Sequence, residues 1–581
     1  MPDYIPPIDD YAFLLKEVFA FEPVMAELYP DLGMDADLAV TVLGEAGRFC
    51  ADVLGPINMS GDQVGARLEN GVVTTAPGFA SAYGAFVEAG WVSLSGAPAY
   101  GGQGLPRVLQ LLVDEMICAT NMSFGLFPGL TRGAVEALER HGSDSLKATY
   151  LPKMISGEWT GVMALTESSA GTDLGLLKCQ AAPGAGDAFA VTGTKIFISS
   201  GDHDFGGNIV HLVLARLPDA PPGVKGISLF LVPKFLVGPD GALGARNSLS
   251  VGSLEHKMGI HAQPTCVMNY DGATGWLVGQ PHRGLQAMFT MMNAERLFVG
   301  MQGLGLAGGA YQKAAAYAKE RLQGRSAEGA RGPVAIVEHA DVRRMLLTIR
   351  AFVEGGRALA IWAAMQMDTV AEHPDADKRA HADGLIALLT PVIKAAFTDM
   401  GFESAVLAQQ VFGGHGYIRE WGIEQFVRDA RIAQIYEGTN GVQAMDLAAR
   451  KLHLENGRLP ARFFAEVEAD LAAVKAAGGA DDIADPVGEA LELLKAATTA
   501  LQSASPDDVG AAACDYLRLF ALAALGWMWA RMAAAAVRVG DETKLAVARF
   551  FVGKLLPQSV GLAAAIGAGS EALGALPSEA F

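Results

Sequence analysis

The residues with the clearest chemical potential lie in the segment 428–440, which reads Arg-Asp-Ala-Arg-Ile-Ala-Gln-Ile-Tyr-Glu-Gly-Thr-Asn. A charged helix end becomes apolar at Ile432 and Ile435 and then presents Glu437 directly before Gly438. A helix-to-loop junction of this kind can aim a carboxylate into a pocket, and the glycine lets a ligand approach a backbone N–H closely. Glu437 is therefore our candidate general base. A solvated glutamate at an ordinary helix end is the alternative.

A polar loop at 163–173, Met-Ala-Leu-Thr-Glu-Ser-Ser-Ala-Gly-Thr-Asp, is predicted to follow a strand. The hydroxyl groups and free backbone N–H groups of such a loop suit hydrogen bonds to the edge of a heterocycle. An ordinary Ser/Gly-rich surface loop is the alternative.

The segment 195–201, Lys-Ile-Phe-Ile-Ser-Ser-Gly, places an aromatic ring and a hydroxyl two residues apart, at Phe197 and Ser199. In an extended strand these side chains share one face, where the ring can stack on a flat heterocycle and the hydroxyl can reach its edge. A core phenylalanine followed by a strand-end serine is the alternative.

Two further segments suit phosphate groups. Arg321 ends a predicted helix, where the helix dipole favours arginine in any case, yet its guanidinium also matches a pyrophosphate. Residues 410–417, Gln-Val-Phe-Gly-Gly-His-Gly-Tyr, offer glycines for close backbone approach. They do not form a G-x-G-x-x-G after a strand, so a Rossmann site is not predicted. His415 is interpreted as a turn residue and not as a catalytic one.

A second acidic candidate lies at 292–297, Met-Asn-Ala-Glu-Arg-Leu, which we predict to begin a long helix. Asn293, Glu295 and Arg296 could form a solvated charged face, or they could meet a ligand.

The segment 428–440 resembles the signature of the acyl-CoA dehydrogenase family, flavoenzymes that oxidise the Cα–Cβ bond of acyl-CoA thioesters. Further matches follow the family order from about residue 94 to 452. The resemblance implies Glu437 as the base, and it implies these contacts to FAD: Thr166, Thr172, Phe197, Ser199, Arg321, Gln323, Gln410, Gly414 and Thr439. It places four residues at the acyl-CoA substrate: Asn293, Arg296, Tyr436 and Gly438.

This sequence departs from the family pattern at two positions, with Ser168 where proline is usual and Gly324 where phenylalanine is usual. Glu295 occupies the position where some members carry their base. We favour Glu437 because its flanking pattern is intact.

The resemblance also implies partners: an acyl-CoA substrate, electron-transferring flavoprotein as electron acceptor, and a second or further copies in a homodimer or homotetramer. Four local patterns resemble the subgroup that oxidises 3-methylmercaptopropionyl-CoA in dimethylsulfoniopropionate degradation: residues 90–92, 102–106, 201–204 and the C-terminal extension. Short or medium straight-chain acyl-CoA oxidation, a peroxide-releasing oxidase and a non-catalytic flavin-bearing scaffold remain as alternatives.

Composition restricts the function classes. The 581 residues suffice for several domains, and a hydrophobic content of 51% with 18% charged residues indicates a folded globular chain. A net charge of −19 argues against nucleic-acid binding. Five cysteines without a C-x-x-C pair predict a reduced, cytoplasmic protein with no structural metal. We see no secretory signal in the N-terminal residues. The apolar run 519–530 is shorter than the roughly 20 residues that a membrane span needs, so we predict a buried helix there.

The elements that must position these residues form a mainly α protein with a central β domain, like the N-terminal helical domain, middle β-barrel and C-terminal helical bundle of the family. Periodicity predicts helices in 1–160, a β domain in 161–280 with strands at 189–199, 208–216 and 226–232, and a helical bundle carrying Glu437 in 281–455. An additional helical domain is predicted for 456–581, for packing and oligomerisation. Glycines at 300, 303, 305, 308 and 309 predict a close approach to another helix or to a ligand.

Overall fold

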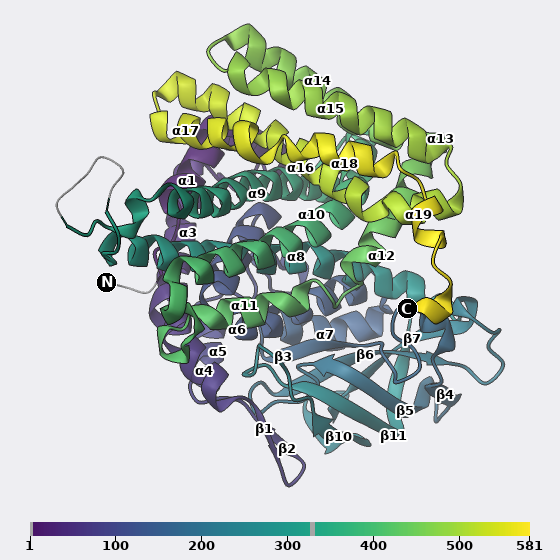
Figure 1. The fold of residues 1–581 in the computed structure, drawn as a ribbon. Coiled ribbons are helices and arrows are strands. Elements are labelled where there is room, and N and C mark those ends of the chain that lie inside the picture. The colour runs from purple at the N-terminus through teal and green to yellow at the C-terminus, as the bar shows by residue number, and fades with distance from the viewer. Residues whose placement is uncertain (1–3, 326–331) are drawn as a thin grey trace. The chain divides into compact units, whose positions relative to one another are not determined.

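A computed structural model describes residues 4–325 and 332–581. Figure 1 labels the helices and strands of the chain. The chain divides into two compact units. The first unit comprises Met1–Arg48, Pro106–Ala119 and Val299–Phe581, and the second comprises Phe49–Leu105 and Thr120–Phe298. Two long helices, α6 (Arg107–His141) and α8 (Gly284–Glu320), contribute residues to both units.

The second unit contains the predicted β domain. Strand β11 (Thr265–Val278) pairs with β5 (Ala188–Ser199) and with β7 (Ile227–Pro233). From β5 the pairing continues through β4 (Gln180–Pro183) to β6 (Asn208–Arg216), which pairs with β7, so the path closes on itself. The predicted β-barrel is confirmed, and the three predicted strands are β5, β6 and β7. Strands β3 (Trp159–Ala164) and β10 (Leu249–Leu254) extend the sheet.

Strand β6 is buried on both faces, and its alternating side chains join two different cores. Leu212 and Leu214 pack in a cluster with residues of α6 and of α7 (Asp144–Ile155). Val213 and Ala215 pack instead among side chains of the other barrel strands. This double burial explains why β6 reads as a nearly continuous apolar run in the sequence.

The remaining elements of the second unit are small. They include the helices α4 (Asn58–Val64) and α5 (Phe79–Glu88), and the two-stranded pairs β1 (Arg67–Glu69) with β2 (Val72–Thr74) and β8 (Phe235–Val237) with β9 (Leu243–Arg246). The first of these pairs adds a short β hairpin to the N-terminal region predicted as helical.

The first unit is helical. Its N-terminal helices are α1 (Ile8–Phe13), α2 (Phe21–Leu28) and most of α3 (Ala36–Phe49). The bundle that carries Glu437 is made of α8, α9 (Ala340–Glu372), α10 (Ala376–Phe412), α11 (Ile423–Ala433) and α12 (Asn440–Met445). The side chain of Asp375 caps α10 by accepting from the N–H groups of Asp377 and Lys378.

Glycines set the distance between α8 and α10. A Cβ atom on Gly303 would lie 2.3 Å from the carbonyl oxygen of Phe397, and one on Gly401 would lie 2.5 Å from the carbonyl oxygen of Gly303. A Cβ on Gly305 would lie 2.5 Å from the carbonyl oxygen of Glu115 in α6. The predicted close helix–helix approach is therefore confirmed at Gly303 and Gly305, because only glycine leaves room for the neighbouring backbones. It is not confirmed at Gly308, where a Cβ atom would meet nothing nearer than 3.8 Å.

The C-terminal tail forms a further set of helices: α14 (Leu459–Ala477), α15 (Asp481–Gln502), α16 (Pro506–Val539), α17 (Glu542–Phe550) and α18 (Gln558–Ile566), with short helices α13 (Leu454–Gly457) and α19 (Glu571–Gly574). The buried Trp529 of α16 donates from its indole N–H to Ala351 of α9 at 3.1 Å. Lys544 of α17 forms an ion pair with Glu354 of α9 at 2.7 Å. The tail therefore packs against α9, as its predicted packing role requires.

Three helical stretches are long and apolar enough to cross a membrane by length and composition: Ala376–Tyr417, Pro506–Val539 and Glu542–Ile566. The apolar run 519–530 lies within the second, a helix of 34 residues, and all of its residues are buried, which confirms the prediction of a buried helix. Of the most apolar windows in these stretches, 78%, 83% and 33% respectively are buried inside the structure.

Candidate functional site

Glu437 lies in the short loop between α11 and α12, as predicted for a helix-to-loop junction. The backbone is left-handed at both Glu437 (φ 56°) and Gly438 (φ 80°). A glutamate rarely adopts this conformation, and such strain concentrates at functional sites when the surroundings enforce it. The Glu437 side chain is half-buried, and its Oε1 atom is inaccessible to solvent.

Helix α10 holds this loop from one side. The buried ammonium group of Lys394 donates to the carbonyl oxygen of Gly438 at 2.8 Å and to the side-chain oxygen of Asn440 at 2.9 Å. Asp399, about one turn further along α10, accepts from the amide groups of Gln434 at 2.6 Å and Asn440 at 2.7 Å. Bonds before, within and after the left-handed pair therefore fix the path of the loop.

Helix α8 holds the loop through Tyr436, whose hydroxyl donates to the side-chain oxygen of Gln302. Thr439 closes the loop by capping α12, because its hydroxyl accepts from the N–H of Val442 at 3.2 Å.

In the second unit, Lys195 joins the two segments that were predicted to contact a heterocycle. Its buried ammonium group donates to the carbonyl oxygen of Leu165 at 2.9 Å and to the carboxylate of Glu167 at 2.8 Å. The backbone N–H of Ile196 donates to the carbonyl oxygen of Thr166 at 2.9 Å. The polar loop at 163–173 therefore lies beside the end of β5 that carries Phe197 and Ser199.

Glu167 anchors this arrangement as a carboxylate. Burial by itself raises the pKa of Glu167, but Lys195 and the backbone N–H groups of Lys178 and Cys179 outweigh burial and hold the pKa below its usual value. The ion pair is nearly inaccessible to solvent, so it fixes the loop more firmly than a surface pair would.

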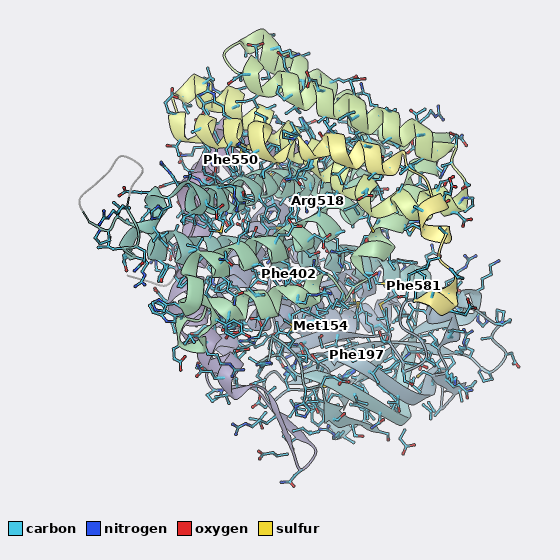
Figure 2. All side chains as sticks on the ribbon, viewed as in Figure 1. Met154, Phe197, Phe402, Arg518, Phe550 and Phe581 are labelled. Carbon is cyan, nitrogen blue, oxygen red and sulfur yellow. The ribbon has the colours of Figure 1, made fainter. Side chains whose placement is uncertain are left out.

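Phe197 is exposed on β5, with 59% of its surface accessible, and its backbone is left-handed (φ 60°). The register between β5 and β11 shifts here, between the pairs Lys195–Met268 and Ile198–Cys266. The strand is confirmed, but this bulge, and not simple alternation, sets the direction of the ring. Figure 2 marks Phe197 on the β domain. Ser199 is half-buried, and Thr172 is exposed.

Asn293 and Arg296 lie on one face of α8, with 3.3 Å between the guanidinium of Arg296 and the amide oxygen of Asn293. The helix begins at Gly284, two turns before the predicted start at this segment. Glu295 is buried, and its carboxylate points to α6: a Cβ on Gly133 would lie 2.7 Å from its Oε1 atom. The two candidate carboxylates therefore have different settings, with Glu295 in a helix core and Glu437 in a strained loop.

The two segments predicted to suit phosphates lie close together in the first unit. Tyr317, in the last turn of α8, stacks on Phe412, and its hydroxyl lies 2.9 Å from Nδ1 of His415. The His415 ring also stacks on Trp421, with 4.4 Å between ring centroids, which agrees with its interpretation as a turn residue. The four residues predicted to meet the cofactor here are all exposed: Arg321, Gln323, Gln410 and Gly414. Part of the Gly-rich loop after Gly324 lies outside the described residues.

The residues that hold the loops were missed by sequence reasoning: Lys394, Asp399, Gln302 and the Lys195–Glu167 pair. Lys394 carried a signal, because it is a lone charge within the apolar run 385–397. The other loop-holding residues carried no such signal in the sequence, because their partners are distant along the chain.

Known proteins resemble this chain over almost its whole length. Family models match residues 42–158 (acyl-CoA dehydrogenase, N-terminal domain), 162–273 (middle domain), 282–452 (C-terminal domain) and 463–577 (acetyl-CoA dehydrogenase C-terminal like). A 3-methylmercaptopropionyl-CoA dehydrogenase of Ruegeria pomeroyi is 44% identical over 95% of this chain and 96% of its own. The chain belongs to the acyl-CoA dehydrogenase family.

Other members of the acyl-CoA dehydrogenase family also span the chain. A butyryl-CoA dehydrogenase of Syntrophomonas wolfei is 33% identical over 100% of this chain and 99% of its own. The crystal structure of Caenorhabditis elegans ACDH-11 in complex with C11-CoA shares the fold, with a TM-score of 0.79 and 21% identity over 96% of this chain and 92% of that one. Membership confirms the predicted fold class and the predicted enzyme class, an FAD-dependent oxidoreductase.

Proposed function

We propose that this protein oxidises the Cα–Cβ bond of 3-methylmercaptopropionyl-CoA to methylthioacryloyl-CoA, with FAD as cofactor and Glu437 as the general base. The substrate is supported by the 44% identity to a 3-methylmercaptopropionyl-CoA dehydrogenase over almost the whole of both chains. The base is supported by one observation above the others: the left-handed backbone at Glu437 lies in a loop that is hydrogen-bonded to Lys394 and Asp399 of α10.

The residues of the β domain fit a flavin. Phe197 offers an exposed ring in a strained backbone, and the loop that carries Thr166 lies beside it. An exposed aromatic face next to hydroxyl and backbone donors suits a planar heterocycle with a polar edge. FAD, when bound there, would supply the acceptor for a hydride from the substrate β carbon.

The chain's own residues must make the α proton removable. A glutamate has a pKa of about 4.3 in water, far too low to deprotonate an unactivated carbon. The backbone N–H of Glu437 would donate to the thioester oxygen and stabilise the negative charge that develops there. Exclusion of water by the bound substrate would raise the proton affinity of the Glu437 carboxylate. Asn293 and Arg296 would hold the CoA portion.

The exposed group of Arg321, Gln323, Gln410 and Gly414 is proposed to meet FAD bound to a neighbouring copy, which implies a homodimer or homotetramer. Light scattering on the purified protein would determine the oligomer. We further propose electron-transferring flavoprotein as the electron acceptor and the cytoplasm as the location.

Anaerobic flavin reduction tests the assignment. Wild-type protein should be yellow and should bleach with 3-methylmercaptopropionyl-CoA. Glu437→Gln should retain FAD and lose at least about 1,000-fold in the bleaching rate, because a neutral amide accepts no proton. Glu295→Gln is the matched control and should bleach readily. A Glu437→Gln protein that keeps FAD and bleaches at the wild-type rate would contradict the base assignment.

Straight short-chain acyl-CoA is the second candidate substrate, because a butyryl-CoA dehydrogenase also aligns over the full chain. Steady-state comparison of 3-methylmercaptopropionyl-CoA with butyryl-CoA and octanoyl-CoA separates the two. A higher kcat/KM for butyryl-CoA would overturn the proposed substrate.

A further inference from the structure

Gln302 of α8 is a fully buried amide that has more hydrogen-bonding capacity than the described protein uses. Its exposed fraction is 0%, and its side-chain oxygen accepts from the hydroxyl of Tyr436. Its Nε2 atom is also buried and contacts no acceptor within residues 4–325 and 332–581. Burial of an amide N–H without a partner is costly, so the surplus donor points to a group outside the chain.

The orientation of the amide decides what the surplus atom can do. The oxygen accepts from the hydroxyl of Tyr436, so the nitrogen is the atom that the described residues leave without a partner. The surplus atom is therefore a donor, and it requires an acceptor.

Gln302 lies at a close helix contact, and it is bound to the residue that precedes the candidate base. It directly precedes Gly303, where α8 meets the backbone of α10 too closely for any Cβ atom. Its partner Tyr436 directly precedes Glu437. The surplus amide atom is therefore held in a fixed relation to the loop that carries the base.

We propose that Gln302 is a specificity-determining residue for the acyl group, an inference that rests on the proposed function. Its Nε2–H donates to an acceptor atom at the γ position of the acyl chain, where a thioether sulfur can accept weakly and a methylene cannot. The site would therefore prefer acyl groups with a γ heteroatom over straight chains of the same length. Tyr436 is the positioning residue, because it orients the amide.

Two substrates isolate this contact. 3-Methylmercaptopropionyl-CoA and pentanoyl-CoA have acyl chains of equal length that differ only by sulfur or methylene at the γ position. The test is the ratio of kcat/KM for the two substrates, in wild type and in Gln302→Leu, which replaces the amide with an apolar side chain of similar size. We expect the ratio to fall by about threefold or more in Gln302→Leu, the effect of one lost weak hydrogen bond.

The ratio of dissociation constants should change in the same direction. It is measured from the flavin absorbance change on titration of Glu437→Gln, with and without Gln302→Leu, where turnover is blocked. Tyr436→Phe keeps the amide donor but removes the hydroxyl that orients it, so it should weaken the preference in the same direction. Loss of preference in Tyr436→Phe with retention in Gln302→Leu would overturn the assignment to Gln302.

Flavin content and thermal unfolding show whether each variant is folded, and Gln302→Met replaces Gln302→Leu if the leucine variant loses its flavin. Equal changes for both substrates would overturn the inference and leave the proposed function standing. Failure of wild type to oxidise either substrate would overturn the proposed function, and the inference with it.

Discussion

The ammonium group of Lys394 lies 2.8 Å from the carbonyl oxygen of Gly438, the residue directly after Glu437. Lys394 is fully buried, and burial of a cation is unfavourable unless it is well hydrogen-bonded. Its bond to Gly438, together with that to Asn440, places a buried cation where it holds a strained loop. The lysine therefore serves the geometry of the site.

Replacement of this lysine should impair the chemical step. Lys394→Met keeps the aliphatic chain and removes the donor, so the loop should relax and the rate of flavin reduction should fall by about 10- to 100-fold. FAD content should be unchanged. The rate is measured by anaerobic stopped flow. Lys378→Met, near the start of the same helix and exposed, is the control and should reduce flavin normally. A wild-type rate of flavin reduction in Lys394→Met would show that Lys394 does not position the loop.

Phe197 is expected to lower the stability of the apoprotein and to strengthen FAD binding. A left-handed backbone costs a side chain roughly 1–2 kcal/mol, so Phe197→Gly should stabilise the apoprotein by about 1 kcal/mol. The same change removes the exposed ring, and FAD affinity should fall about tenfold. Urea unfolding and fluorescence titration measure the two effects. Phe197→Tyr keeps the ring and should keep the affinity; equal FAD affinity in Phe197→Gly would show that the ring does not stack on the flavin.

The contact between α8 and α10 should tolerate no added methyl group. Gly303→Ala would bring a Cβ atom to 2.3 Å from the carbonyl oxygen of Phe397 and should destabilise the protein by about 3 kcal/mol, at the upper end of overpacking. Gly308→Ala lies on the same helix with its closest neighbour at 3.8 Å, and it should be neutral or stabilising by up to about 1 kcal/mol. Chemical denaturation measures both. Similar effects of the two substitutions would show that helix propensity, and not close approach, explains these glycines.

Because of Asp368, the free energy of unfolding should decrease as pH rises, the opposite of the usual effect of a carboxylate. Burial raises the pKa of Asp368 to about 6, although Tyr29 and the N–H groups of Arg107 and Val108 donate to it. Because the folded pKa lies above the unfolded value of 3.8, this contribution is complete below pH 3.8 and is lost as pH rises through about 6.

The free energy of unfolding of wild type, relative to Asp368→Asn, should therefore decrease between pH 4 and pH 7, by roughly 3 kcal/mol at most. Denaturation of both proteins at a series of pH values measures the difference. A difference that stays constant over this range would show that Asp368 does not titrate there.

The sequence by itself determined the fold class, the strands β5 to β7 and the junction at Glu437, because these depend on local periodicity, glycine positions and a short contiguous motif. It also indicated that the glycines of α8 serve close packing. These properties depend on residues that are neighbours in the sequence, so they could be predicted before the structure was known.

Only the tertiary structure decided what holds the site. The bonds of Lys394 to Gly438 and of Gln302 to Tyr436 span 44 and 134 residues of sequence, and no local pattern pairs such partners. The bulge that turns Phe197 outward depends on the register of β5 against β11, which alternation along one strand cannot reveal. Long-range pairing is set by the packing of whole elements, and for this reason the strained loop and its buried partners became visible only in the folded chain.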